Sequence, residues 1–302
     1  MTEPTKLTGD MFTKKPLKGQ HALVTGGSRG IGAAVSNYLA RLGANISLTG
    51  RTKKTLTAQA EHLISEFEVQ VFTAIGDMSQ EQDVKRCFSE AVETLSSVNI
   101  LINNAGVGKS APFHRMDTDF WNTIIGLNLT GTFLCTKQVI GAMRDAGYGR
   151  IVNISSTVGL RGYPYIAAYC ASKHGVIGLT RTLALECVKK GITVNAICPG
   201  FIATPLAAVG RDRVAETQVN FAKSQPWPEF GDGVHIAGAA LFLASEDARF
   251  VTGEHIVVDG GLTAAGPELS RRFPRGSARD SRVVGVTKGS TGEAADITRL
   301  DA

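Results

Sequence analysis

The sequence predicts a doubly wound α/β fold, in which seven mostly parallel strands form one sheet with helices on both faces. Short β-rich apolar runs alternate with segments of helical length along the chain. Several runs are continuously apolar, which is typical of strands covered on both faces. The 34 glycines cluster at strand ends rather than in a low-complexity stretch, which indicates tight turns and close approach of the backbone to a ligand.

The elements can be assigned in chain order. The predicted strands are 21–27, 45–51, 69–77, 99–106, 149–156, 191–200 and 254–261. Helical patterns lie between them, for example at 32–42 and 81–95. No linker interrupts residues 18–263, so we expect one domain there, after an N-terminal extension over 1–17. Residues 264–302 are rich in Gly, Ser, Arg and Asp, which predicts a flexible tail or a segment that docks on a neighbouring subunit.

Composition and charge exclude several classes of protein. The 43% hydrophobic and 20% charged residues are ordinary for a globular chain. The net charge of +5 is spread along the chain, so we expect no nucleic-acid partner. Five cysteines without a C-x-x-C pair predict neither disulfides nor a metal site. The polar N-terminus and the absence of an apolar run of about 18 residues predict a cytoplasmic protein outside membranes.

The segment 25–32 reads TGGSRGIG, directly after the first predicted strand and at the start of the first predicted helix. Its three spaced glycines, Gly26, Gly30 and Gly32, allow a tight turn and close approach of the backbone to a pyrophosphate. The helix N-terminus supplies free N–H groups and the positive end of the helix dipole. This position between strand and helix makes the motif specific for a dinucleotide.

The second predicted strand indicates which dinucleotide is bound. It ends in Arg51, where NAD-binding sheets place a carboxylate for the ribose 2′-hydroxyl. Arg51 and Arg29 suit the 2′-phosphate of NADP(H) instead, and residues 49–57 contain no Asp or Glu. Asp77, after the third strand, either accepts a hydrogen bond from the adenine amine or caps the following helix.

A tyrosine and a lysine near the middle of the chain predict proton transfer. Tyr169 and Lys173 are spaced i, i+4, so both lie on one helix face. A nearby ammonium and an oxidised nicotinamide would lower the phenol pKa from about 10 and allow proton exchange with an alcohol or ketone oxygen. Ser156 ends the fifth strand, where its hydroxyl can bind the same oxygen. Ser155 points to the opposite side and is expected to be structural.

These motifs, in this order and spacing, resemble the short-chain dehydrogenase/reductase family over residues 18–263, and the resemblance implies a single-domain Rossmann fold. The matches are Thr25, Gly26, Gly30, Gly32, Asn103, Asn104, Ala105, Gly106, Asn128, Ser156, Tyr169, Lys173, Pro199, Gly200, 251–253 and 259–261. By resemblance, Tyr169 is the general acid in ketone reduction and the base in alcohol oxidation. Ser156 orients the carbonyl, Lys173 binds the nicotinamide ribose, and Asn128 anchors a water that extends the proton relay.

The same resemblance assigns the residues that bind NADP(H). The expected set is Gly26, Ser28, Arg29, Gly30, Ile31, Gly32, Arg51, Asp77, Met78, Asn104, Ala105, Gly106, Tyr169, Lys173, Pro199, Gly200, Ile202 and Thr204. Ile202 and Thr204 are expected to face the carboxamide. The family also implies a homodimer or homotetramer.

The substrate is predicted only as a class. Loops after the fourth, fifth and sixth strands, at 107–113, 157–166 and 201–230, contain many aromatic residues, which favours a bulky or apolar ketone. The resemblance also implies a 3-oxoacyl-type compound. The last of these loops is expected to form a helical lid. The chain most resembles the ketoacyl and polyketide ketoreductase branch, but Glu229 replaces the usual arginine of relatives, which argues against carrier or coenzyme A thioesters. A sugar, polyol or cyclic alcohol dehydrogenase, and a non-catalytic NADP-binding regulator, are the alternatives.

Overall fold

The computed structural model describes residues 15–204, 226–227 and 229–264. Most of the predicted N-terminal extension, most of the predicted lid over 201–230 and nearly all of the predicted tail lie outside the described residues. Within the described part of the chain, no helix combines the length and the apolar character that crossing a membrane requires.

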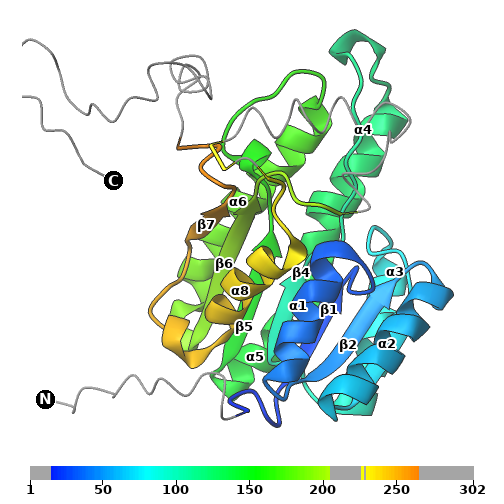
Figure 1. Ribbon diagram of the computed structural model, residues 1–302, viewed down its shortest axis with the longest axis vertical. Helices are drawn as coiled ribbons and strands as arrows, with labels where there is room; N and C mark the ends of the chain where they lie inside the picture. Colours follow the sequence, from blue (N-terminus) through cyan, green and yellow to red (C-terminus); the bar gives the residue numbers. More distant parts are fainter. Residues whose placement is uncertain (1–14, 205–225, 228, 265–302) are drawn as a thin grey trace, which may run out of the picture.

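Seven parallel strands form a single sheet in the order β3-β2-β1-β4-β5-β6-β7 (Figure 1). The strands are β1 (His21–Thr25), β2 (Asn45–Gly50), β3 (Val71–Ile75), β4 (Ile100–Asn103), β5 (Gly149–Ile154), β6 (Ile192–Pro199) and β7 (His255–Val258). Each lies within one of the seven predicted runs. The order 3-2-1-4-5-6 is that of the Rossmann fold, so the predicted fold class is confirmed.

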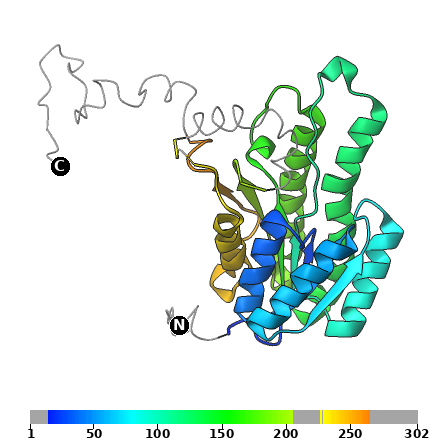
Figure 2. The ribbon, with the colours of Figure 1, turned by 45° about the vertical axis from the view of Figure 1, so that its right-hand side comes forward.

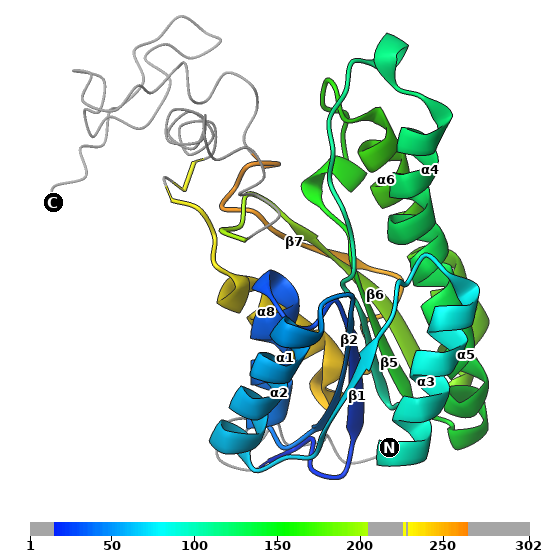
Figure 3. The ribbon, with the colours of Figure 1, turned by 90° about the vertical axis from the view of Figure 1, so that its right-hand side faces the viewer.

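Helices cover both faces of the sheet (Figure 3). One face carries α1 (Gly30–Arg41), α2 (Lys53–Phe67) and α8 (Gly233–Ala244). The other carries α3 (Glu81–Leu95), α5 (Gly131–Ala146) and α6 (Ala167–Cys187). In the described part of the chain, the other helical segments are η1 (Phe113–Arg115), α4 (Thr118–Ile125), the π-helical η2 (Gly126–Thr130), η3 (Thr157–Gly159), η4 (Val188–Lys190) and η6 (Glu246–Ala248).

Alternate residues of each central strand belong to different cores. Ala22 and Val24 pack under α1 and α8, whereas Leu23 between them packs under α3 and α5. On β4, Ile100 packs in the first of these cores and Leu101 in the second. Because successive side chains of a strand point to opposite faces, a sheet covered on both faces requires apolar residues at every position. This explains the continuously apolar runs in the sequence.

A buried arginine fixes the edge of the sheet opposite the carboxyl ends of the strands. The Arg150 side chain is 2% exposed. Its guanidinium donates to the carbonyl oxygens of Ser245 (3.2 Å) and Gly149 (2.9 Å) and to Glu246 Oε1 (3.0 Å). The cation also lies 4.5 Å from the ring centre of Tyr148. Since removing one partner of a buried charge is strongly destabilising, this cluster holds β5 and the end of α8 together.

All five cysteines are free thiols. Four are buried, in strands or on the inner faces of helices: Cys87, Cys135, Cys187 and Cys198. The fifth, Cys170, is partly exposed.

Candidate active site

The glycine loop presents backbone N–H groups at the carboxyl edge of the sheet. Gly26 and Gly30 have φ angles of 61° and 55°, a conformation that favours glycine. Helix α1 begins at Gly30, and its N-cap residue, Arg29, makes no side-chain capping bond. The N–H groups of the first turn therefore lack a side-chain acceptor, which fits an anionic group such as a pyrophosphate.

Asn104 fastens the end of β4 to this loop. Its Nδ2 donates to the carbonyl oxygens of Thr25 (2.9 Å) and Gly26 (3.1 Å). In return, Thr25 Oγ1 accepts the N–H groups of Asn104 and Ala105, both at 3.0 Å. A β-carbon on Gly32 would lie 2.5 Å from Asn104 Nδ2, so only glycine fits there. The sequence named Thr25 only as the first residue of TGGSRGIG and did not predict these hydrogen bonds. Its position at the end of β1 was the available signal, because the other site residues also follow strand ends.

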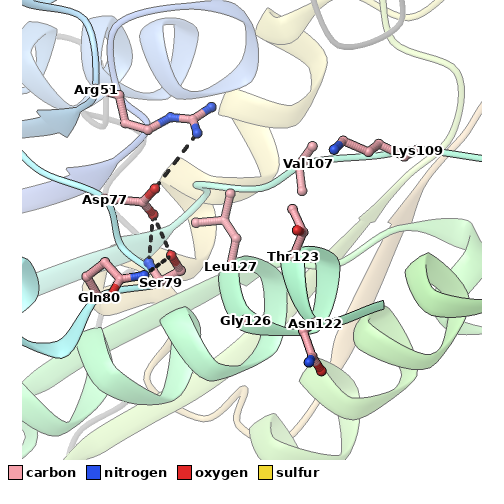
Figure 4. Close-up of a pocket in the computed structure, with 10 residues that line it drawn as sticks. All are labelled: Arg51, Asp77, Ser79, Gln80, Val107, Lys109, Asn122, Thr123, Gly126 and Leu127. Carbon is pink, nitrogen blue, oxygen red and sulfur yellow. Dashed lines mark hydrogen bonds and ion pairs between the residues drawn. The ribbon is translucent and has the colours of Figure 1, made fainter. Parts of the chain in front are cut away.

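A cavity of about 470 Å³ lies between the ends of β2 and β3, the loop after β4 and the helix α4–η2 (Figure 4). Its lining residues are Arg51, Asp77, Ser79, Gln80, Val107, Lys109, Asn122, Thr123, Gly126 and Leu127. Two predicted cofactor residues thus face one space. Lys109 was not singled out as a site residue. The sequence indicates it only by its position in the loop after the fourth strand.

Asp77 stabilises the turn before α3 but does not cap the helix, because the N-cap residue is Gln80 and the helix has no side-chain cap. Its Oδ1 accepts the backbone N–H (2.9 Å) and the hydroxyl (2.8 Å) of Ser79, just before α3. Its Oδ2 lies 3.8 Å from Arg51 Nη1. The Arg51 side chain is 70% exposed, so solvent screens this pair strongly and leaves the guanidinium accessible to a ligand. The predicted hydrogen bond of Asp77 to the adenine amine stays a prediction.

The other predicted cofactor residues differ in whether their side chains are accessible to a ligand. Ser28 Oγ lies 3.1 Å from Thr55 Oγ1, and Arg29 is exposed. By contrast, Met78 and Ile202 are buried side chains, 3% and 6% exposed. Ile202 packs in the core and Met78 accepts a hydrogen bond from Thr49, so only their main chains are available to a ligand.

The remaining predicted residues lie along β6 and the loop that follows it. Pro199 is the last residue of β6 and pairs with Val258. A β-carbon on Gly200 would lie 2.7 Å from the Cα of Asp259, so this approach of β6 to the end of β7 requires glycine. Asp259 itself caps the following turn, where its Oδ2 accepts the N–H and the hydroxyl of Thr263, both at 2.7 Å. Thr204 is the last described residue before the gap.

The predicted catalytic side chains meet at the ends of β4 and β5. The Tyr169 phenol lies close enough to the Ser156 hydroxyl for that hydroxyl to lower its pKa. Lys173 is 5% exposed; its Nζ donates to the carbonyl oxygen of Ile154 (2.7 Å) and lies 5.8 Å from the Tyr169 ring centre. A β-carbon on Gly106 would lie 3.7 Å from this Nζ and 3.2 Å from Asn128 Oδ1. A side chain at this position would therefore crowd the Asn128 amide.

Burial sets the protonation of both groups. It raises the pKa of Tyr169, and the hydrogen bond with Ser156 only partly opposes this effect. Burial also lowers the pKa of Lys173 to about 8. In the protein alone, desolvation is the largest influence on the phenol pKa. The lowering expected from the ammonium together with an oxidised nicotinamide stays a prediction. The phenol is protonated at neutral pH.

The Asn128 side chain makes hydrogen bonds that the sequence did not predict. It lies in η2, where α4, η2 and α5 form one continuous helix (Figure 2). Its Oδ1 accepts the N–H of Val107 (2.8 Å), and its Nδ2 donates to the Val107 carbonyl (3.0 Å) and to Ser172 Oγ (3.1 Å). Ser172 Oγ in turn donates to the Tyr169 carbonyl (2.8 Å). The loop after β4 and the tyrosine helix are thereby joined, and Ser172 was missed although it lies within YCASK.

The neighbours of the catalytic residues lie outside the site. Ser155 is buried and donates to the Lys173 carbonyl (3.0 Å), which is the structural role expected from strand alternation. His174 is exposed, and its Nδ1 lies 2.9 Å from the Cys170 carbonyl on the same helix. Neither His174 nor Cys170 points to the tyrosine hydroxyl by helix geometry.

Comparison with known proteins identifies the family of the chain. The family model described as enoyl-(acyl carrier protein) reductase matches residues 26–263. The chain is 36% identical over 246 residues to a 3-oxoacyl-[acyl-carrier-protein] reductase of Aquifex aeolicus, covering 82% of this chain and 98% of that protein. It is 40% identical over 242 residues to an acetoacetyl-CoA reductase of Shinella zoogloeoides, covering 80% and 97%.

A solved structure extends the comparison. A single-residue variant of actinorhodin polyketide ketoreductase with NADPH superposes with a TM-score of 0.78 at 33% identity, over 82% of this chain and 98% of that chain. All three named relatives are reductases. With the Rossmann order of strands and the convergent Ser156, Tyr169 and Lys173, the chain belongs to the short-chain dehydrogenase/reductase family of nicotinamide-dependent oxidoreductases, in its ketoreductase-like branch.

Proposed function

We propose that this protein is an NADPH-dependent reductase that converts a ketone to a secondary alcohol, reversibly. The observation that carries the proposal is the convergence of Tyr169, Ser156 and Lys173 beside a glycine loop whose first helical turn has no side-chain cap. The names of the relatives support carbonyl reduction.

Each side chain has a distinct part in this reaction. The bound nicotinamide supplies the hydride. Tyr169, which is protonated at neutral pH, donates a proton to the carbonyl oxygen. Ser156 donates a second hydrogen bond to the same oxygen, and Lys173 holds the ribose. Asn128 fixes the loop at Val107 against the helix of Tyr169, so that the proton donor keeps its position.

Substitution of Tyr169 by Phe tests the proton donor. The Tyr169→Phe variant should lose about 10²- to 10⁴-fold in kcat, the usual contribution of a positioned acid, while NADPH binding changes less than about twofold because the ring and Lys173 remain. Stopped-flow turnover and fluorescence titration with NADPH measure the two effects. Unchanged turnover would refute the role of the phenol.

Preference for NADPH rests on Arg51, Arg29 and the hydroxyl pair of Ser28 and Thr55. The two cations are exposed at the glycine loop and the end of β2. Hydrogen bonds to a charged group contribute about 1.5–3 kcal/mol, so NADPH should bind roughly ten- to hundredfold more tightly than NADH. Arg51→Asp should reverse most of this difference. Tighter binding of NADH by the unmodified protein, measured by calorimetry, would overturn the assignment.

The proposed substrate is a bulky or apolar ketone, or a 3-oxoacyl compound. Described aromatic residues of the substrate loops with large exposed fractions support it: Phe113 is 76%, Tyr165 65% and Trp227 64% exposed. A panel of aryl ketones, cyclic ketones, β-ketoesters and acyl thioesters, followed by NADPH absorbance, identifies the class. Faster oxidation of sugars or polyols than reduction of any ketone would favour the alternative dehydrogenase activity.

We also propose that the protein forms a homodimer or homotetramer through α5 and α6. Phe133 on α5 and Leu185 on α6 are 47% and 81% exposed. Gly141 and Gly178, on the same two helices, have open space where a β-carbon would stand. Glycine inside an exposed helix is unfavourable, and a closely packed neighbouring helix would explain both positions.

A further inference from the structure

A turn before the catalytic helix holds a tyrosine where glycine is favoured. Pro164 and Tyr165 occupy a turn, and Tyr165 has a φ angle of 68°. In turns with proline at the first central position, a positive φ at the second position favours glycine or asparagine. A β-carbon makes this conformation unfavourable. The tyrosine is therefore retained against a local conformational cost.

Burial of the ring does not offset this cost. The Tyr165 side chain is 65% exposed, so folding removes little of its surface from water. The backbone is nevertheless held firmly: the Tyr165 carbonyl oxygen accepts the N–H of Ala111 at 2.8 Å. On the other side of the turn, Arg161 Nη2 donates to the Leu262 carbonyl (2.6 Å) and its Nε to Tyr163 Oη (3.1 Å). The surrounding structure thus imposes the conformation.

The position of the turn connects it to the reaction. Tyr165 lies four residues before Tyr169, just ahead of α6. Ala111 belongs to the loop after β4, whose Val107 is bound by Asn128. The bond between Ala111 and Tyr165 therefore joins the two loops that flank the catalytic side chains. Backbone strain that the surroundings maintain is characteristic of functional sites.

We propose that Tyr165 is a specificity-determining residue, whose exposed ring contacts the part of the ketone remote from the reacting carbonyl and favours aromatic or bulky apolar substituents. This inference rests on the proposed ketone reduction. An aromatic ring fixed by a rigid turn loses little conformational freedom when it binds a flat substituent, so it discriminates by contact area.

Substitution of Tyr165 by Gly separates the ring from the backbone. Tyr165→Gly should leave the melting temperature unchanged or raised, because glycine tolerates this φ. It should lower kcat/KM for an aryl ketone about tenfold and that for 2-butanone less than twofold. Tyr165→Phe should keep the aryl preference. The matched control is Glu68→Gly: Glu68 is exposed, has a φ of 55° and caps α2, so it should show the same thermal behaviour with an unchanged substrate ratio.

The outcomes are distinct. An unchanged ratio of the two kcat/KM values in Tyr165→Gly, with normal NADPH binding, overturns the inference alone. An equal fall with both ketones also overturns it, because it would indicate general damage to the site. If the unmodified protein consumes NADPH with neither ketone nor any other carbonyl of the panel, the proposed function fails and this inference fails with it.

Discussion

At the scale of single residues, burial has opposite effects on the two catalytic groups. It raises the pKa of the Tyr169 phenol, whose charged form is an anion, and lowers the pKa of the Lys173 ammonium to about 8. Near neutral pH both groups carry their protons. The protein alone is therefore poised to donate a proton, which is what the reduction of a carbonyl requires.

The two directions of the reaction should consequently differ in pH dependence. For reduction, kcat/KM should fall as pH rises above about 8, since Lys173 loses its charge there and Tyr169 deprotonates at higher pH. For oxidation of the alcohol, which requires the phenolate as base, kcat/KM should rise over the same range. Initial rates from pH 6 to 10 measure both profiles. Reduction that accelerates with pH would contradict the assigned protonation.

The sequence predicted the residues of the candidate site but not their environment. The i, i+4 spacing placed Tyr169 and Lys173 on one helix face. The direction of the phenol pKa could not be predicted, because it depends on the desolvation that the assembled site imposes. The Lys173 hydrogen bond is likewise formed with the carbonyl of Ile154, a backbone group that no side-chain pattern identifies.

At the scale of secondary-structure elements, the π-helical segment is the unusual feature of the site. One residue of η2, Asn128, bonds both backbone groups of Val107 and the hydroxyl of Ser172. π-helical insertions are frequent at functional sites because they redirect side chains out of the regular α-helical register. Here the segment aims an amide at the loop after β4, and that loop forms one wall of the site.

Removal of this amide should loosen the site and the fold together. Asn128→Ala leaves a backbone N–H of Val107 without its acceptor, so the free energy of unfolding should fall by about 1–3 kcal/mol. Turnover should fall as well. Urea unfolding and steady-state rates measure these effects. The matched control is Asp145→Ala, at an exposed position of α5 in the same continuous helix and away from the cavity, which should change stability by less than about 0.5 kcal/mol. Equal effects of the two substitutions would contradict this role of η2.

The elements themselves were largely predictable, but this insertion was not. Each strand lies within a predicted apolar run, and α3 has the predicted bounds of 81–95. In contrast, the residues of η2, GLNLT, have no composition that distinguishes a π-helix from an α-helix. The distinction arises from tertiary hydrogen bonds between Asn128 and a loop about 20 residues earlier, which periodicity does not contain.

At the scale of the whole molecule, the exposed face of α5 and α6 should decide the oligomeric state. Leu185→Glu places a charge in the proposed contact, so light scattering should report a mass below that of the unmodified dimer or tetramer. Ile64→Glu is the matched control, because Ile64 is 52% exposed on α2, across the sheet from α5 and α6, and should leave the mass unchanged. A monomeric unmodified protein would refute the proposed assembly.

The global fold could be predicted because its requirements repeat along the chain. A sheet covered on both faces requires apolar residues on every strand, and this pattern identifies the doubly wound class without knowledge of any contact. The order of the strands does not follow from the pattern; it came from the resemblance to a family. The Arg150 cluster was not predicted, since a single arginine in GRIVNI gives no sign that it is buried.

Because the five thiols are buried to different extents, their reactivity reports local unfolding of the protein. In the native state an alkylating reagent should react quickly with Cys170 alone, one residue from Tyr169. The four buried sulfurs become available only when a segment of the fold separates from its neighbours. Counting modified sulfurs by mass spectrometry over time would therefore resolve which layer of the molecule opens first.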